Sequence, residues 1–355
     1  MILDLAKVFV PAILSFAFGI ALTPLLTHYL YTKRMWKKKA GKIDLDGKET
    51  PLFNKLHETR ETGTPRLGGI IIWVSTLLSI LTVSFFVTIS GSEPLQSLDF
   101  LSRNQTWIPL AVLLLGAFIG FIDDLFEIRG TNGKTGGLSL RKRLILVGLI
   151  GLLCGLWFYF KLEVSFVGFP FIGPLFIGAF LIPLFSLITI GVYSGGIIDG
   201  IDGLAGGIFA IIFGAYGIIA FFQYQIDLAA FCAALVGGIL AFLWFNIPPA
   251  RFYMSETGSM ALTLALAVVA FMTDSLGGGK GLSVLPIIAF PLVITSLSAI
   301  IQMMSKKFLK RKVFRIAPLH HHFEALGWPS YKVTMRYWVF GVIAALLGSV
   351  VALVG

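Results

Sequence analysis

Long apolar stretches alternate with short polar segments along nearly the whole chain of 355 residues. About 20 apolar residues are enough for an α-helix to cross a hydrocarbon core roughly 30 Å thick. The stretches lack the strict polar and apolar alternation of a lipid-facing barrel strand, so we interpret them as helices. Ten spans are predicted, at 7–31, 67–90, 107–122, 144–162, 174–194, 204–222, 227–245, 260–276, 282–304 and 336–354.

Composition strengthens this interpretation. Hydrophobic residues make up 57% of the chain, and the mean hydropathy of +0.89 is far above that of a soluble domain. The first apolar run is longer than the core of a signal peptide and is followed by no small-residue cleavage site, so we expect it to remain as an anchor. We therefore expect an all-α, polytopic membrane protein that forms a single domain over residues 1–355.

The basic residues predict an orientation. If the loop after the first span is cytoplasmic and the sides alternate, 24 of the 28 lysines and arginines lie on the cytoplasmic side. The positive-inside rule then places both termini outside the cytoplasm. The net charge of +10 could also indicate a nucleic-acid partner. Orientation and attraction to anionic lipid headgroups account for the distribution of charge, so no nucleic acid is expected.

Carboxylates gather beside the predicted spans, on the side expected to be cytoplasmic. The acidic residues at these positions are Asp123, Asp124, Asp199, Asp202 and Glu256. A charge at membrane depth costs about 2.5 to 3.5 kcal/mol, so it is by default a functional-site hypothesis. Two adjacent anions such as Asp123 and Asp124 repel each other, which suits a divalent metal or a general base. The second pair lies in a glycine-rich stretch, SGGIIDGIDGLAGG at 194–207, and would share one face if that stretch were helical.

Candidate partners for phosphate lie on the same expected side. Arg141 and Arg143 follow a glycine pair and could contact phosphate oxygens. Tyr253 lies in a short loop, where an aromatic residue is usually packing or an interface anchor; stacking on a planar base is the sharper alternative. The run His320–His322 would point in directions about 100° apart in a helix and could not bind one metal together. We expect one or two of these histidines to contact phosphate or to titrate.

Carboxylates, cations and histidines on one side of a polytopic bundle favour magnesium-assisted phosphoryl transfer from a soluble donor to a lipid acceptor. A transporter would more naturally place its charges near the middle of the membrane, within inverted repeats. The sequence shows no such repeat.

Motifs along almost the whole chain resemble, in order, those of the phospho-N-acetylmuramoyl-pentapeptide transferase family, a branch of the polyprenyl-phosphate N-acetylhexosamine-1-phosphate transferase superfamily. They are TPRLGG at 64–69, FIDD at 121–124, GGLS at 136–139, DGIDGLAGG at 199–207, FNIPPA at 245–250, ETGS at 256–259 and APLHHHFEALGWP at 317–329. The last motif looks specific to the muramoyl-pentapeptide branch. Ten helices with both ends outside is also the architecture of that family.

The resemblance implies a reaction of peptidoglycan synthesis in the bacterial inner membrane. Undecaprenyl phosphate would attack the β-phosphate of UDP-MurNAc-pentapeptide, giving lipid I and UMP with the help of Mg²⁺. A homodimer is also implied, because family members commonly form dimers. One alternative is the sibling enzyme that transfers GlcNAc-1-phosphate to the same lipid. The other is a catalytically impaired homologue with a binding role.

Together, the residues and the resemblance give three candidate groups. The catalytic candidates are Asp123, Asp124, Asp199, His320 and His321. The candidates for substrate binding are Asp202, Asn246, Tyr253, His322, Arg141, Arg143 and Arg60. The candidate Mg²⁺ ligands are Asp123, Asp124, Asp199 and Glu256. In the family, the first acidic pair is proposed to act on the lipid phosphate or the metal, and the aromatic position to stack on uracil.

Several positions depart from the pattern of the family. Glu256 stands where the family has a magnesium-binding aspartate, and its extra methylene moves the carboxylate by more than about 1 Å unless the backbone compensates. Glu127 falls where a lysine is usual, and Arg66 replaces a threonine. Tyr193 and Gly196 fall where the family has asparagines.

Overall fold

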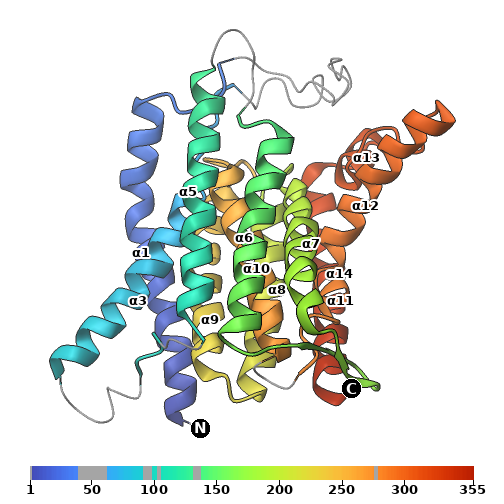
Figure 1. The fold of residues 1–355 in the computed structure, drawn as a ribbon. Coiled ribbons are helices and arrows are strands. Elements are labelled where there is room, and N and C mark those ends of the chain that lie inside the picture. The colour runs from blue at the N-terminus through green and yellow to red at the C-terminus, as the bar shows by residue number, and fades with distance from the viewer. Residues whose placement is uncertain (1, 39–61, 91–97, 102–104, 131–136, 276–278) are drawn as a thin grey trace.

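The computed structural model describes residues 2–38, 62–90, 98–101, 105–130, 137–275 and 279–355, and 10 helices within them are long and apolar enough to cross a membrane (Figure 1). The predicted number of ten helical spans is thereby confirmed, and the bounds of several spans differ from the prediction. The main helices are α1 (Ile2–Thr32), α3 (Ile70–Ser90), α5 (Trp107–Arg129), α6 (Leu140–Phe160), α7 (Leu181–Ser194), α8 (Leu204–Phe222), α9 (Ile226–Asn246), α10 (Ser255–Ser275), α12 (Phe290–Met304) and α14 (Ser330–Val354).

Short elements complete the described chain. Two of them extend main helices: the 3₁₀ turn η2 (Gly195–Ile198) follows α7, and the π-helical turn η3 (Ser305–Leu309) follows α12. The remaining short elements are η1 (Gly178–Phe180), α11 (Leu285–Ile288), α13 (Leu319–Ala325), β1 (Phe166–Phe169) and β2 (Gly173–Phe176).

Helix α10 is the centre of the bundle. Its sequence from Met260 to Met272 is small or apolar on every side. All of these residues are buried, so no face of this part of the helix is exposed to lipid or water. A helix that is apolar all round needs apolar surroundings, either lipid or protein, and here other helices provide them. It packs against α3, α5, α7 and α8. The hydroxyl of Thr263 donates to the carbonyl of Ser259 over 2.7 Å, which satisfies it within the apolar core.

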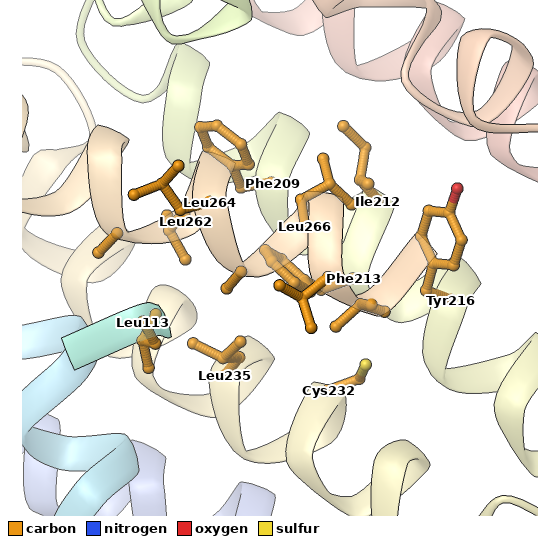
Figure 2. Packing of buried hydrophobic residues seen from close by; sticks show 14 of the residues in the cluster. Leu113, Phe209, Ile212, Phe213, Tyr216, Cys232, Leu235, Leu262, Leu264 and Leu266 are labelled. Carbon is orange, nitrogen blue, oxygen red and sulfur yellow. The ribbon is translucent and has the colours of Figure 1, made fainter. Parts of the chain in front are cut away.

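Figure 2 shows how α8, α9 and α10 share one apolar core. Phe209 and Phe213 of α8 and Leu262 and Leu266 of α10 are all fully buried. Cys232 of α9 lies among these side chains with a free thiol. It therefore acts as a small core residue. Helix α10 begins about two turns before this core, at Ser255, and its first turn carries part of the candidate site.

A small antiparallel hairpin replaces the first turns of the span predicted at 174–194. Strand β1 pairs with β2, so that Phe166 lies opposite Phe176 and Phe169 opposite Gly173. Gly173, the first residue of β2, and Gly178, which follows the hairpin, have φ values of +98° and +56°, a conformation that few other residues adopt. Gly173 lies where the chain turns from one strand to the other, and Gly178 begins the short turn that leads into α7. The hairpin was missed because its apolar side chains continue the hydrophobic run of α7.

Charged helix ends are the other correction to the predicted spans. Helix α5 continues beyond 122 to Arg129, α6 begins at Leu140 and α10 at Ser255. Asp123, Asp124 and Glu256 therefore lie on helices and not on loops. We ended the spans at charges, but a helix continues wherever charged side chains find partners, as these do.

Both described chain ends lie at one end of the bundle, near the N and C labels of Figure 1. The C-terminal end of α5 and the start of α10, with the candidate acidic residues, lie at the opposite end. This agrees with an even number of crossings. Which end faces the cytoplasm stays a prediction.

Candidate active site

A cavity of about 550 Å³ opens at the end of the bundle that carries the candidate residues. Helices α5, α6, α7, α9, α10, α12, α13 and α14 contribute to its wall. The predicted site residues that line it are Arg143, Asp199, Asp202, Asn246, Tyr253, Glu256 and His321. They come from five separate stretches of sequence. The fold therefore gathers most of the predicted residues around one space.

Asp124 joins α5 to the start of α10. Its carboxylate accepts hydrogen bonds from the backbone N–H groups of Glu256 and Thr257, at 3.3 and 2.9 Å, and from the Thr257 hydroxyl at 2.6 Å. The first N–H groups of a helix have no partner within it and attract negative charge. Asp124 thus caps α10 from a neighbouring helix. It is fully buried and does not line the cavity.

The close approach of the two helices depends on Gly120. A Cβ atom there would run into the backbone of Glu256 and Thr257. Since backbone cannot yield as a flexible side chain does, a larger residue would push α5 away from α10. Gly120 thereby sets Asp124 against the helix start.

Glu127 lies one turn further along α5 in a charged cluster. It bonds to Arg66, and Nζ of Lys37 lies 3.0 Å from its other oxygen. Arg66 also lies 3.6 Å from the carboxylate of Asp124. Arg66 and Glu127 are two of the departures from the family pattern, and the structure shows that they are partners.

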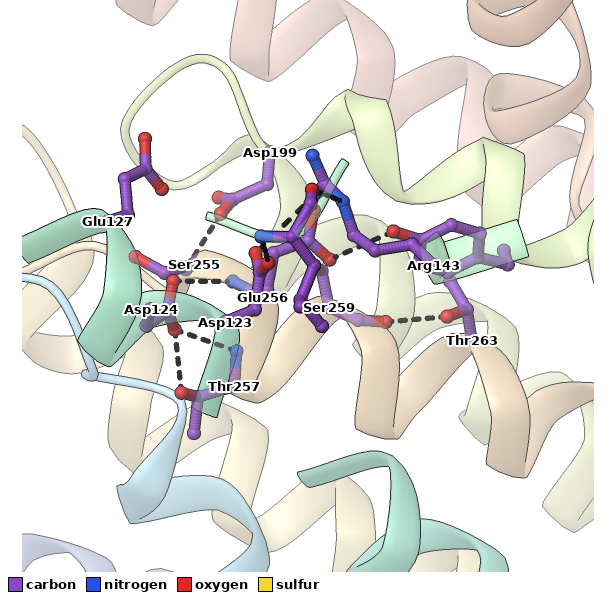
Figure 3. A network of polar contacts seen from close by, with 12 residues as sticks. Asp123, Asp124, Glu127, Arg143, Asp199, Ser255, Glu256, Thr257, Ser259 and Thr263 are labelled. Carbon is purple, nitrogen blue, oxygen red and sulfur yellow. Dashed lines mark hydrogen bonds and ion pairs between the residues drawn. The ribbon is translucent and has the colours of Figure 1, made fainter. Parts of the chain in front are cut away.

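Asp123 faces a different set of groups. It accepts a hydrogen bond from the N–H of Leu138 and lies 3.7 Å from Nη1 of Arg143. The same Arg143 nitrogen bonds to Glu256, so two carboxylates share one guanidinium (Figure 3). The hydroxyl of Tyr193 donates to the second oxygen of Glu256 over 3.4 Å. This arrangement places the carboxylate of Glu256 and two donors, Arg143 and Tyr193, at the cavity wall, while Asp123 is almost fully buried beside Arg143 and does not line the cavity.

The glycine-rich stretch does not form the single helix face considered for its two aspartates. After η2 ends at Ile198 the chain turns, and the two carboxylates bind different segments, one the first residue of α10 and the other the loop before it. Asp199 accepts from the N–H of Ser255 at 2.9 Å, and Asp202 from that of Ala250 at 3.2 Å. A helical face would have required continuous helix, which the turn at 199–203 prevents.

Asn246 holds the same two segments together. Its amide oxygen accepts from the N–H of Gly203 over 2.9 Å, and its amide nitrogen donates to the carbonyl of Phe252 over 2.8 Å. Since it uses both ends of the amide, an acid or a hydrocarbon could not replace it without loss. Tyr253 follows directly and lines the cavity.

The three histidines lie on α13 and diverge, as expected for a helix. A Cβ on Gly200 would lie 2.5 Å from Nε2 of His320 and 2.8 Å from that of His321, so both rings pack directly on the glycine-rich stretch. Nδ1 of His321 lies 2.7 Å from Glu324, which also accepts from the Ser330 hydroxyl. This contact orients the ring that lines the cavity.

His322 turns away from the cavity. Its Nδ1 accepts from the backbone N–H of Arg315 at 3.2 Å, and its ring meets the edge of Phe314. Burial and the positive charge of Arg315 lower the pKa of His322 below its ordinary value of 6.5. The structure therefore does not bring this candidate to the site.

Two further candidates lie elsewhere. Arg141 is exposed on α6 and does not line the cavity. Arg60 lies outside the described residues. Lys37 and Glu324 also line the cavity but were not among the candidate site residues, and Arg66 and Tyr193 were noted only as departures. The departure from the family pattern was the one sequence signal that could have pointed to Arg66 and Tyr193.

Comparison with known proteins identifies relatives of this chain. The family model described as glycosyl transferase family 4 matches residues 106–274. A phospho-N-acetylmuramoyl-pentapeptide-transferase of Chloroflexus aggregans is 35% identical over 333 residues, covering 90% of this chain and 83% of its own. Proteins of the same name from Geobacillus sp. and Bacillus thuringiensis are 35% and 34% identical, and each alignment covers at least 95% of both chains.

The chain belongs to the phospho-N-acetylmuramoyl-pentapeptide-transferase family. The relatives share it over most of its length, so the resemblance seen in the motifs is confirmed. The names of these transferases do not favour the sibling GlcNAc-1-phosphate activity. With ten apolar helices, this family member is a multi-pass protein of the bacterial inner membrane.

Proposed function

We propose that the protein transfers phospho-MurNAc-pentapeptide from UDP-MurNAc-pentapeptide to undecaprenyl phosphate, forming lipid I and UMP. The observation that carries the proposal is the contact of Asp123 and Glu256 with one side chain, Arg143, which lines the cavity together with Glu256. Carboxylates and a guanidinium at one point are the groups that phosphoryl transfer needs to bind and neutralise a diphosphate. The family membership supplies the identity of the substrates.

The reaction is a direct displacement. An oxygen of the lipid phosphate forms a bond to the β-phosphorus, the bond from that phosphorus to the oxygen bridging to the α-phosphate breaks, and UMP leaves with the electron pair. We assign Asp123 to the proton or charge of the attacking phosphate, since it lies beside Arg143 and Glu256. We assign Asp124 to positioning, because its oxygens already accept three hydrogen bonds from α10.

Mg²⁺ is part of this proposal. Hard cations of this kind take carboxylate oxygens and complete their coordination with substrate phosphates and water. Asp123 and Glu256 fit, since both already lie beside one cationic group, and Glu256 and Asp199 line the cavity. When bound, Mg²⁺ would neutralise charge on the diphosphate. We further propose cytoplasmic placement of the cavity and a homodimer, the latter tested by mass measurement in detergent.

The test is product analysis in detergent with undecaprenyl phosphate and either UDP-MurNAc-pentapeptide or UDP-GlcNAc. We expect UMP and lipid I from the first donor, a loss of turnover with chelator, and little product from the second. Preference for UDP-GlcNAc would assign the chain to the sibling activity. Glu256→Asp is assayed beside wild type: turnover only in this variant would mean that the natural protein is impaired.

A further inference from the structure

We propose that Arg143 is the resident counter-ion of the ligand-free site, and that it moves from Asp123 and Glu256 to the diphosphate when the nucleotide and its divalent cation bind. The proposal rests on the proposed function for the identity of the nucleotide. It concerns a residue of this chain and an order of binding, which that function does not specify.

Arg143 is held beside both carboxylates by several contacts. Its Nη1 bonds to Glu256 and lies 3.7 Å from Asp123, while its Nε donates to the carbonyl of Leu138 over 3.1 Å. The N–H of Leu138 in turn donates to Asp123. The guanidinium is therefore placed between the two carboxylates by contacts on both sides (Figure 3).

The positive charge of Arg143 offsets the repulsion between Asp123 and Glu256. Asp123 is almost fully buried, and the side chain of Glu256 is only 22% exposed. Two carboxylates that share one partly buried position repel each other unless a cation lies beside both. Arg143 supplies that cation before any ligand arrives. A divalent cation on the same two carboxylates would make the guanidinium superfluous there and would repel it.

The site offers few protein ligands to a metal ion. In the part of the chain that the structure describes, no three acidic, histidine or cysteine side chains converge as a ready-made metal cage. Mg²⁺ commonly takes one or two carboxylates and completes its shell with substrate phosphates. Metal and diphosphate should therefore bind together, and each should favour the other.

The Arg143 side chain can reach a diphosphate bound in the cavity. Its side chain is 24% exposed and lines the cavity, so it can reach a ligand there without unfolding of α6. A guanidinium binds phosphate oxygens in a two-pronged fashion. The Tyr193 hydroxyl meanwhile keeps its contact with the second oxygen of Glu256. Glu256 thus stays oriented when Arg143 leaves.

The experiment is Mn²⁺ binding to the whole protein in detergent, followed by electron paramagnetic resonance without lipid phosphate. We expect UDP-MurNAc-pentapeptide to raise the Mn²⁺ affinity of wild type at least tenfold. Without nucleotide, we expect Arg143→Gln to bind Mn²⁺ at least tenfold more tightly than wild type. Arg143→Lys, which keeps the charge, should stay close to wild type. Lys142→Gln removes the same charge from an exposed neighbour and is the matched control.

Two results would overturn the proposal: Arg143→Gln binding Mn²⁺ no more tightly than Lys142→Gln, or wild type binding Mn²⁺ as tightly alone as with nucleotide. The second measurement needs no variant, so it decides the matter even if Arg143→Gln fails to fold. Failure of the proposed function is seen separately. A wild type that releases no UMP shows that failure, and the comparison of Arg143→Gln with Lys142→Gln does not depend on it because it is made without nucleotide.

Discussion

Thr257 donates both its backbone N–H and its hydroxyl to the carboxylate of Asp124, at 2.9 and 2.6 Å. Because all these groups are buried, removing the hydroxyl leaves the carboxylate short of one donor. Thr257→Val should lower the free energy of unfolding by about 1.5 to 3 kcal/mol, the range for hydrogen bonds to charged groups. Thermal unfolding in detergent measures the change. Thr257→Ser keeps the donor and should lose much less; equal losses would contradict the capping role.

Arg66 and Glu127 should behave as a coupled pair. Glu127→Lys alone would place three cations together, namely the new lysine, Arg66 and Lys37. We therefore expect a lower melting temperature and slower UMP release. Adding Arg66→Thr should recover part of both losses, since it removes one of the cations.

The control for this pair is Glu163→Lys, the same change at an exposed acid distant from the cavity along the chain. It should leave melting temperature and turnover near wild type. Losses that simply add in the double variant would show that Arg66 and Glu127 act independently.

Gly200 should tolerate no side chain. An added Cβ would press on Nε2 of both His320 and His321, and displacing a catalytic group by about 1 Å can cost about 100-fold in rate. We expect Gly200→Ala to lower kcat by at least tenfold. The matched variant is Gly196→Ala, whose Cβ would lie 3.7 Å from that of Ser259, an ordinary contact. Similar rates for the two variants would argue against histidines fixed on the glycine-rich stretch.

His322 should make stability depend on pH in one direction. Its pKa is lowered in the folded protein, so between that value and 6.5 the unfolded chain binds more protons. The stability difference between wild type and His322→Asn should be constant above pH 6.5 and move against wild type as the pH falls. Melting temperatures of both proteins from pH 8 to pH 5, values chosen about the ordinary histidine pKa of roughly 6.5, test this. A difference that is independent of pH would contradict it.

The helices could be predicted from sequence because a membrane leaves the backbone few options. Any span must satisfy its own N–H and C=O groups, so apolar length alone indicates a helix. The hairpin at 166–176 was missed for the same reason, since its apolar side chains look like the start of a span. The ends of α5 and α10 were misplaced because the partners of Asp124 and Glu127 come from distant segments.

The site was predictable as a set of residues but not as a set of contacts. Motif position singled out Asp123, Glu256 and His321, and the fold brings these regions to one end of the bundle. Sequence spacing cannot show that Arg66 pairs with a residue 61 positions away. It also could not tell which histidine of α13 faces the cavity, because that depends on how the helix is rotated against Gly200.

The most direct test of the account is UMP release from UDP-MurNAc-pentapeptide with undecaprenyl phosphate, comparing wild type, Asp123→Asn and Asp227→Asn. Asp227 pairs with Lys7 near the start of α9, away from the cavity, and provides the same change of side chain. We predict turnover by wild type and Asp227→Asn, and a loss of about 100-fold or more in Asp123→Asn. Equal turnover in the two variants, or none in wild type, would contradict the account.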